Sequence, residues 1–368
     1  MNPGAAGTAS FALISFILLI PAFSWHIKCR NIPATLLIFW LMLVNLIGSI
    51  NTLIWSSENF DQVWDGKGWC DLTIKLEAGS SSGKICAIAC LSMNLYMILC
   101  AKNPLFMEWS WKKTIIELSI CLITPIFIMC TQYIIQGSRY GIVKYQGCVV
   151  NYSATTATLG LYSMWSVIWS ILAFIFAILT IYKYLQKRKD VKDIFKCTNS
   201  GLNIKRFARL LIFSFLIIIA MFPLSVYYFV EQAKNSTGKF NWDEVHHPNW
   251  DVILYYDFGF FLLYDRIVNS ILSVLTFLLF GIGTDALTMY RGWLRLKKNS
   301  DTPLSKQTTF VKVESGKSQY SSTTTFTQPT LQEFHEFKDV LQEFHEIKDV
   351  LQESDDNIGY KYEVKAKV

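Results

Sequence analysis

Charged residues are scarce in this sequence of 368 residues, where Asp, Glu, Lys and Arg together make up 17%. A soluble domain usually carries about 25% charged residues. Here 52% of the residues are hydrophobic and the mean hydropathy is positive. This composition excludes a soluble globular protein and points to a chain that spends most of its length in a membrane.

Histidine and intramembrane charge are also rare, which excludes several kinds of membrane chemistry. The chain has five histidines, and only His26 lies near an apolar segment, so we predict no metal site and no metal-dependent hydrolase. The last apolar segment has no lysine for a retinal Schiff base. The apolar segments show no internal repeat, which disfavours a transporter. We therefore predict no enzyme activity and no cofactor, and we favour a bundle that binds a ligand outside and reports it inside.

What the sequence does have is a series of seven long apolar segments. A helix needs ~20 largely apolar residues to cross the ~30 Å hydrocarbon core, and we predict spans at 10–26, 34–55, 85–100, 114–135, 159–182, 207–230 and 267–290. The third starts only at Ile85, because Gly79-Ser-Ser-Ser-Gly83 precedes it and Lys84 sits at its edge. Backbone groups find no water in a bilayer, so we expect an all-α membrane protein, a seven-transmembrane helix bundle.

Polar residues within or at the mouths of these spans are few, and such residues are costly there and usually functional. They are Asn45, Asn51, Asn94, Asp265, Arg266, Asn269 and Asp285.

The distribution of basic residues predicts the orientation. Lys and Arg gather after the first, third, fifth and seventh spans, and the alternate connections are rich in Asp and Glu. Basic connections stay on the cytoplasmic side, so we predict the N-terminus outside and the C-terminus inside. The formal net charge of +6 then reflects this bias, and we predict no nucleic-acid partner. Residues 1–10 carry no charge, so we expect the first span to be its own insertion signal.

Two features fall on the predicted outer side. Of nine cysteines, only Cys70 and Cys148 lie there, so we predict a disulfide between them, with an unpaired couple as the alternative. The sequons that begin at Asn151 and Asn235 also lie there and are predicted glycosylation sites, with chance occurrence as the alternative.

Proline and composition divide the rest of the chain. Pro125 and Pro223 lie inside the fourth and sixth spans, and we predict a hinge at Pro223, with a static kink as the alternative. Residues 1–298 are predicted to form the membrane domain. We predict that residues 299–368, which are rich in Ser and Thr and carry a tandem decamer repeat at 331–350, form a disordered cytoplasmic tail.

Six stretches of the membrane domain carry a family resemblance. They are Trp64-Asp-Gly-Lys-Gly-Trp-Cys-Asp71, Arg139-Tyr-Gly-Ile142 with Gly147-Cys148, Lys187-Arg-Lys-Asp-Val-Lys-Asp193, Cys197-Thr-Asn-Ser-Gly-Leu-Asn203, Arg206-Phe-Ala-Arg-Leu-Leu-Ile-Phe213 and Phe280-Gly-Ile-Gly-Thr-Asp-Ala-Leu-Thr-Met-Tyr290. They resemble the fungal a-factor-type mating pheromone receptors, which are class D seven-transmembrane G-protein-coupled receptors. Other receptor classes have Asp/Glu-Arg-Tyr at the inner end of the third span, where this chain has Lys102-Asn-Pro104. The activation switch that the motif provides in those classes is therefore not carried over to this chain.

The resemblance implies a multi-pass receptor of the plasma membrane that triggers the mating response. Its ligand would be a prenylated peptide pheromone, farnesylated and methyl-esterified, which partitions into membrane lipid. Its partner inside would be a heterotrimeric G protein. A transporter of a lipopeptide or lipid is the alternative, and a homodimer is left open.

The resemblance also guides the choice of contact residues. For the ligand we predict aromatic and charged residues of the outer loops, with interfacial belt residues as the alternative for the aromatics: Trp242, Trp250, Tyr255, Tyr256, Asp251, Asp257, Arg139 and Tyr140. For the G protein we predict the basic connection between spans five and six, with topology-setting charge as the alternative: Lys187, Arg188, Lys189, Lys192, Lys205, Arg206 and Arg209.

Overall fold

The protein is described by a computed structural model that covers five segments of the chain: residues 3–100, 111–186, 204–236, 238–259 and 264–281, without the side chains of 204–210, 213 and 220. All five belong to the first of the two compact units into which the chain divides, Met1–Thr302. The predicted boundary at residue 298 and the predicted tail with its decamer repeat lie outside the described residues.

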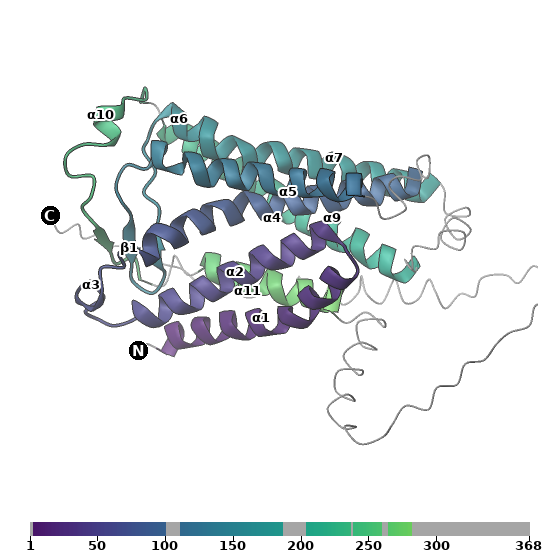
Figure 1. The fold of residues 1–368 in the computed structure, drawn as a ribbon, viewed down its shortest axis with the longest axis horizontal. Helices are drawn as coiled ribbons and strands as arrows, with labels where there is room; N and C mark the ends of the chain where they lie inside the picture. Colours follow the sequence, from purple (N-terminus) through teal and green to yellow (C-terminus); the bar gives the residue numbers. More distant parts are fainter. Residues whose placement is uncertain (1–2, 101–110, 187–203, 237, 260–263, 282–368) are drawn as a thin grey trace, which may run out of the picture. The chain divides into compact units, whose positions relative to one another are not determined.

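Seven helices in the described residues are long and apolar enough to cross a membrane, as the apolar segments predict (Figure 1). They are α1 (Pro3–Lys28), α2 (Ile32–Ile54), α4 (Trp69–Cys100), α5 (Trp111–Thr131) with the 3-10 turn η2 (Gln132–Ile135), α7 (Met164–Gln186) preceded by α6 (Thr156–Thr158) and the π-helical turn η3 (Leu159–Ser163), α9 (Ile204–Asn235), and α11 (Tyr264–Thr276) continued by the π-helical turn η5 (Phe277–Gly281).

Helix α4 is the central element of the bundle, since it packs against α2, α5, α7 and α9. Helix α1 packs against α2 and α11, and η5 packs against both α1 and α9. The largest buried cluster joins these helices through small and branched side chains such as Leu41, Ala87 and Ile218. Close approach of helices through small residues is the usual way in which membrane bundles gain packing energy.

The third predicted span begins much too late, because α4 starts at Trp69 and not at Ile85. The sequence Gly79-Ser-Ser-Ser-Gly83 is helical and buried for most of its length. The Ser80 and Ser81 hydroxyls donate to the Glu77 carbonyl, at 2.8 and 3.0 Å. A Cβ at Gly79 would lie 2.8 Å from Met129, and one at Gly83 would collide with the Trp40 indole. Small residues therefore mark a helix–helix contact here, not a loop.

Outside the long helices, short elements form a separate layer. The strands β1 (Gly141–Val143), β2 (Gly147–Val149) and β3 (Leu254–Tyr256) make a sheet of order β2-β1-β3, antiparallel for β1 with β2 and parallel for β1 with β3. Figure 1 shows this sheet with α3 (Phe60–Val63) and α10 (Trp242–Val245) at the end of the bundle where α1 begins. These elements come from the connections that sequence reasoning assigns to the outside.

The two prolines predicted to kink helices lie inside elements that continue through them. Pro125 is buried in α5, and Pro223 is exposed on α9. The Ser225 hydroxyl donates to the Met221 carbonyl at 2.8 Å, across the turn that contains Pro223. The role of Pro223 as a hinge stays a prediction.

Candidate binding site

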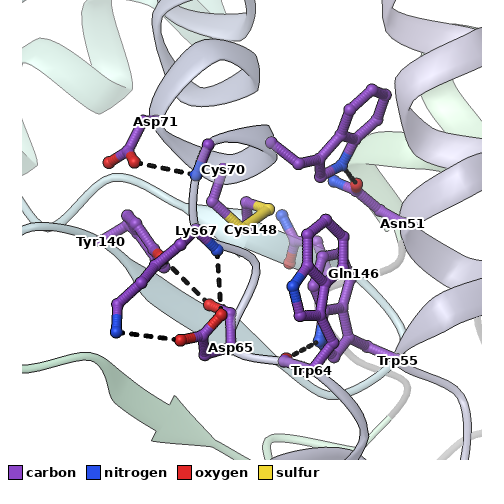
Figure 2. Close-up of a disulfide and its surroundings, with 12 residues drawn as sticks. Asn51, Trp55, Trp64, Asp65, Lys67, Cys70, Asp71, Tyr140, Gln146 and Cys148 are labelled. Carbon is purple, nitrogen blue, oxygen red and sulfur yellow. Dashed lines mark hydrogen bonds and ion pairs between the residues drawn. A yellow bond between two sulfur atoms is a disulfide. The ribbon is translucent and has the colours of Figure 1, made fainter.

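The connections 55–68, 136–155 and 238–259 meet at one end of the bundle, and we call them the cap. A disulfide joins Cys70 in the first turn of α4 to Cys148 in β2, with 5.4 Å between the Cα atoms (Figure 2). Both cysteines are buried. This is the pair that sequence reasoning joins, and it fixes the β1–β2 hairpin to α4. A crosslink that closes a loop of 78 residues removes much entropy from the unfolded chain.

Next to the disulfide, the cap has its own small core. The Trp55 ring stacks on Trp64 with 5.8 Å between centroids, and its Nε1 donates to the Trp64 carbonyl at 3.0 Å. Tyr140 is fully buried and its hydroxyl donates to the Asp65 carbonyl at 3.0 Å (Figure 2). Burial, with the nearby charge of Asp71, raises the pKa of Tyr140 to about 12. Tyr140 therefore supports the cap from inside and offers no exposed side chain.

Arg139 joins two of the three cap connections, 136–155 and 238–259, to α4. Its Nε and Nη2 donate to the two carboxylate oxygens of Asp71 at 3.0 and 2.8 Å. Its Nη1 donates to Asp251 at 2.6 Å, and its backbone N–H donates to the Trp250 carbonyl at 2.8 Å. These carboxylates raise the pKa of Arg139, Asp71 first. The fork geometry of a guanidinium suits such a double contact.

Lys144 makes a second crosslink at the other end of β1. Its Nζ lies 3.0 Å from Glu58 and 3.1 Å from Asp257. The hydrogen bond that Lys144 donates to Glu58 is the main cause that raises the pKa of Lys144. With the Arg139–Asp251 pair before the strand and the Lys144–Asp257 pair after it, β3 is held against β1 at both ends.

The tip of the β1–β2 hairpin reaches the helices. The Tyr145 N–H donates to the Trp55 carbonyl at 2.9 Å, and the Tyr145 side chain clusters with Ala5 of α1. Tyr145 and Gly147 have φ values of 70° and 81°, and a Cβ at Gly147 would lie 2.5 Å from Asn51. Only glycine fits a left-handed position with so close a neighbour. The tip is thereby packed against α1 and α2.

Below the tip, a buried ionic cluster connects the cap to α4 and α11. Arg266 donates from Nη2 to the Gln146 carbonyl at 3.3 Å, and its Nη1 lies 2.6 Å from Glu77. The Lys84 Nζ donates to Asn269 Oδ1 at 2.5 Å. Arg266, Lys84 and Asn269 are all buried. The hairpin tip is therefore in direct contact with α11.

The polar residues predicted inside the spans pair helices with one another. Asn45 of α2 donates to Ser273 at 2.7 Å and accepts from Ser270 at 2.8 Å, both in α11. Asn51 accepts from Trp69 Nε1 at 2.8 Å. Asn94 of α4 donates to Glu117 of α5 at 2.7 Å. Asp265 is exposed at the first turn of α11, and Asp285 lies outside the described residues.

The aromatic residues predicted for ligand contact fall into two places. Trp242 stacks on His246 with 4.0 Å between centroids, and Trp250 meets Tyr133 edge-on at 5.2 Å, beside η2. Trp250 Nε1 also donates to the Gln136 carbonyl at 2.7 Å.

The other two aromatics lie in β3, over a different part of the cap. Tyr255 is 37% exposed and meets the Phe60 ring at 6.1 Å, and Tyr256 stacks on Phe258 at 5.5 Å. Sequence reasoning treated these residues and the two tryptophans as one loop surface.

Several residues that organise the site were missed by sequence reasoning. Glu58 and Lys144 were counted only among the outer charges, and Asp71 only as a charge and as the last residue of a family motif, although all three form the crosslinks of the cap. Tyr133 and His246 were not singled out, although both lie in the aromatic group with Trp242 and Trp250. The excess of acids in the outer connections is the one signal that could have indicated ion pairs here.

The two sequons differ in the exposure of their asparagine. The Asn151 amide donates to Ser138 Oγ at 2.8 Å and is half-buried. Asn235 is exposed at the C-terminal end of α9. Glycosylation stays a prediction at both.

The residues predicted for G-protein contact cannot be placed as side chains. Lys187, Arg188, Lys189 and Lys192 lie outside the described residues. Lys205, Arg206 and Arg209 belong to the first turns of α9, where the structure describes the backbone only.

Comparison with known proteins adds an independent line of evidence. A family model described as "Pheromone A receptor" matches residues 8–300. The chain is 44% identical over 284 residues to the pheromone a factor receptor of Saccharomyces cerevisiae, which covers 77% of this chain and 60% of that relative. It is 27% identical over 227 residues to the pheromone M-factor receptor of Schizosaccharomyces pombe, covering 61% and 60%. It is 24% identical over 295 residues to pheromone receptor 1 of Mycosarcoma maydis, covering 77% and 82%. The chain thus spans 60% of the length of the first two relatives.

Proposed function

Because the chain belongs to the pheromone A receptor family, we propose that it is a G-protein-coupled receptor for a prenylated peptide mating pheromone. The observation that carries this proposal is the match of the family over residues 8–300, which includes all seven helices. The transporter alternative finds no support in the three relatives, each of which is named as a receptor.

The proposed ligand is a farnesylated, methyl-esterified peptide that reaches the receptor from membrane lipid. Each CH₂ group of the farnesyl chain that is buried in the bilayer contributes about 0.8 kcal/mol to membrane binding. The farnesyl group therefore concentrates the peptide at the bilayer surface. The peptide part would then meet the exposed residues of the cap. Trp242, Tyr255, Asp251 and Asp257 are exposed and available for this contact, and Trp250 and Tyr256 lie half-buried beside them. Arg139 and Tyr140 would shape the site by holding the cap together.

The proposed orientation has the cap outside the cell, in a multi-pass protein of the plasma membrane. Two observations support it. The cap contains the Cys70–Cys148 disulfide, and disulfides persist in oxidising compartments. The basic connections join the opposite ends of the helices, as the positive-inside rule requires of cytoplasmic segments.

In the proposed mechanism, the peptide stabilises one of two conformations of the bundle. A ligand shifts such an equilibrium only by its difference in affinity for the two states. The contact of Arg266 with the Gln146 carbonyl offers a route from the cap to α11, and Pro223 offers a hinge in α9. The basic residues Lys187, Arg188, Lys189, Lys192, Lys205, Arg206 and Arg209 would receive the heterotrimeric G protein.

The test is reporter activation in a pheromone-responsive yeast strain that lacks its own receptor and expresses this chain. The strain receives a farnesylated, methyl-esterified a-factor peptide or the same peptide without its farnesyl group. We expect a response to the farnesylated peptide only. Silence toward a panel of lipopeptides, with surface expression verified and the cognate G protein present, would overturn the proposal.

We also propose Asn235 as the glycosylated sequon, because Asn235 is exposed whereas the Asn151 amide is engaged with Ser138. Treatment with an endoglycosidase should shift the wild-type chain and the Asn151→Gln variant on a gel. The Asn235→Gln variant should show no shift. A shift that is lost only in Asn151→Gln would contradict this assignment.

A further inference from the structure

Strand β3 has one paired and one open edge. It lies at the end of the sheet, where β1 pairs with it on one side. The Leu254 N–H donates to the Tyr140 carbonyl at 3.4 Å, and the Lys144 N–H donates to the Tyr256 carbonyl at 3.0 Å. Leu254 and Tyr256 therefore direct their backbone groups toward β1. Successive residues of a strand point their backbone groups to opposite sides, so the N–H and C=O of Tyr255 face the open edge.

Nothing in the described part of the chain pairs with this edge. The side chains along it are exposed and apolar, with Leu254 at 39%, Tyr255 at 37% and Phe258 at 55% exposure. Proteins usually protect an open edge with charged side chains. The two carboxylates beside β3, Asp251 and Asp257, stay exposed, but each is balanced by a cation, Arg139 or Lys144, so they protect the edge only weakly.

The same ion pairs hold the open edge in a fixed geometry. Arg139 precedes β1 and Lys144 follows it, and their partners precede and follow β3. A binding surface that is already ordered loses less entropy when a partner binds. The strand is thus a preformed template and does not need to fold on binding.

We propose that the peptide part of the pheromone binds as a fourth strand along the open edge of β3. This rests on the function proposed above. An extended main chain supplies a donor and an acceptor at the spacing that Tyr255 offers, and pockets for alternate side chains then give specificity. The chemistry beside the edge favours a basic residue in the peptide. Asp61 is exposed and forms no ion pair within the described residues. Asp61 and Asp65 both lie close enough to Tyr255 that, after burial, their charges raise its pKa.

The test removes the backbone donor and keeps the strand. Tyr255→Pro deletes the N–H that faces the open edge and leaves both hydrogen bonds to β1, and proline is tolerated on an edge strand in this orientation. Tyr255→Val is the matched control, because it also removes the ring but keeps the N–H and favours a strand. With the farnesylated a-factor peptide as probe, we expect the half-maximal concentration in the reporter strain to rise about tenfold for the proline variant. The valine variant should shift far less. Equal shifts in the two variants would assign binding to the ring and overturn strand pairing.

A second measurement does not depend on the folding of a variant. The wild-type receptor is tested with a-factor peptides that carry one backbone N-methyl group at successive positions. We expect a loss of potency at one position, whose N–H donates to the Tyr255 carbonyl, and little effect at the two neighbouring positions, whose N–H groups face away from β3. Equal losses at neighbouring positions, or no loss at any position, would overturn the proposal. An unchanged pheromone response of Tyr255→Pro, together with loss of self-association between two receptor copies, would also overturn it, because the edge would then pair with a second receptor. Silence of the wild-type chain toward the whole peptide panel would instead overturn the proposed function, and the pairing with it.

Discussion

At the scale of single residues, the cap depends on side chains that each reach two partners. Arg139 binds Asp71 and Asp251, and Lys144 binds Glu58 and Asp257. Each cation therefore joins segments far apart in the sequence. Exposed ion pairs contribute little. Arg139 and Lys144 are themselves largely buried, however, so each gives up hydration that its two carboxylate partners offset.

Replacement of Arg139 should destabilise the receptor. We expect Arg139→Ala to lower the free energy of unfolding by about 1–2 kcal/mol, since the hydrogen bonds to Asp71 and Asp251 are lost together. The measurement is the thermal unfolding midpoint of the purified receptor in detergent. Lys67→Ala is the control, because the Lys67–Asp65 pair is exposed and should contribute almost nothing. Equal unfolding midpoints for wild type and Arg139→Ala would show that the contacts of Arg139 do not contribute to the stability of the receptor.

The buried pair of Arg266 and Glu77 predicts a larger effect that depends on both partners. Breaking a buried ion pair from one side costs about 3–5 kcal/mol, because the remaining charge loses its partner. We expect Arg266→Ala to show such a loss in thermal unfolding, and the double variant with Glu77→Ala to lose less than the two single variants added together. Additive losses would mean that the 2.6 Å contact between them carries no coupling energy.

Residue-level features differ in how far the sequence predicts them. The Cys70–Cys148 bridge could be predicted, because only two cysteines fall on the predicted outer side. The partners of Arg139 could not, because Asp71 and Asp251 come from different connections and the sequence holds several other acids on that side. Charge alone indicates on which side of the membrane a residue lies, and it does not indicate with which residue it forms an ion pair.

At the scale of elements, α4 shows where hydropathy is insufficient. The second, fourth and fifth spans were predicted with ends within about four residues of those observed. The start of α1 was placed seven residues late, and the predicted end of the seventh span lies outside the described residues. The start of α4 was placed sixteen residues late, at Ile85 and not Trp69. Gly79, Gly83 and the serines between them lower the hydropathy, and they are there because Met129 and Trp40 pack against this part of the helix. The reason is tertiary packing, which a single sequence does not display.

The same packing predicts opposite outcomes for two glycines. Gly83→Ala places a Cβ against the Trp40 indole, and overpacking of this kind costs about 1–3 kcal/mol. Gly7→Ala in α1 meets no atom within 4 Å, so the better helix propensity of alanine should leave the stability equal or slightly higher. Thermal unfolding of the two variants side by side is the measurement. A Gly83→Ala variant as stable as Gly7→Ala would contradict the close contact of α4 with α2.

At the scale of the whole molecule, the described unit combines a helical bundle with a crosslinked cap. The hairpin tip contacts α1 through Tyr145, α2 through Gly147 and α11 through Gln146, while the disulfide ties β2 to α4. The hairpin is thus in contact with four of the seven described helices. This connection is the structural basis on which we expect an external peptide to bias the conformation of the bundle.

The most direct test of the proposed receptor function is guanine-nucleotide exchange with purified components. The chain is reconstituted in lipid vesicles with its cognate heterotrimeric G protein, and uptake of a non-hydrolysable GTP analogue is followed over time. We predict that the farnesylated, methyl-esterified a-factor peptide accelerates uptake and that the peptide without its farnesyl group does not. Uptake that is the same with and without the farnesylated peptide, while labelled peptide crosses into the vesicles, would contradict the receptor function and identify a transporter.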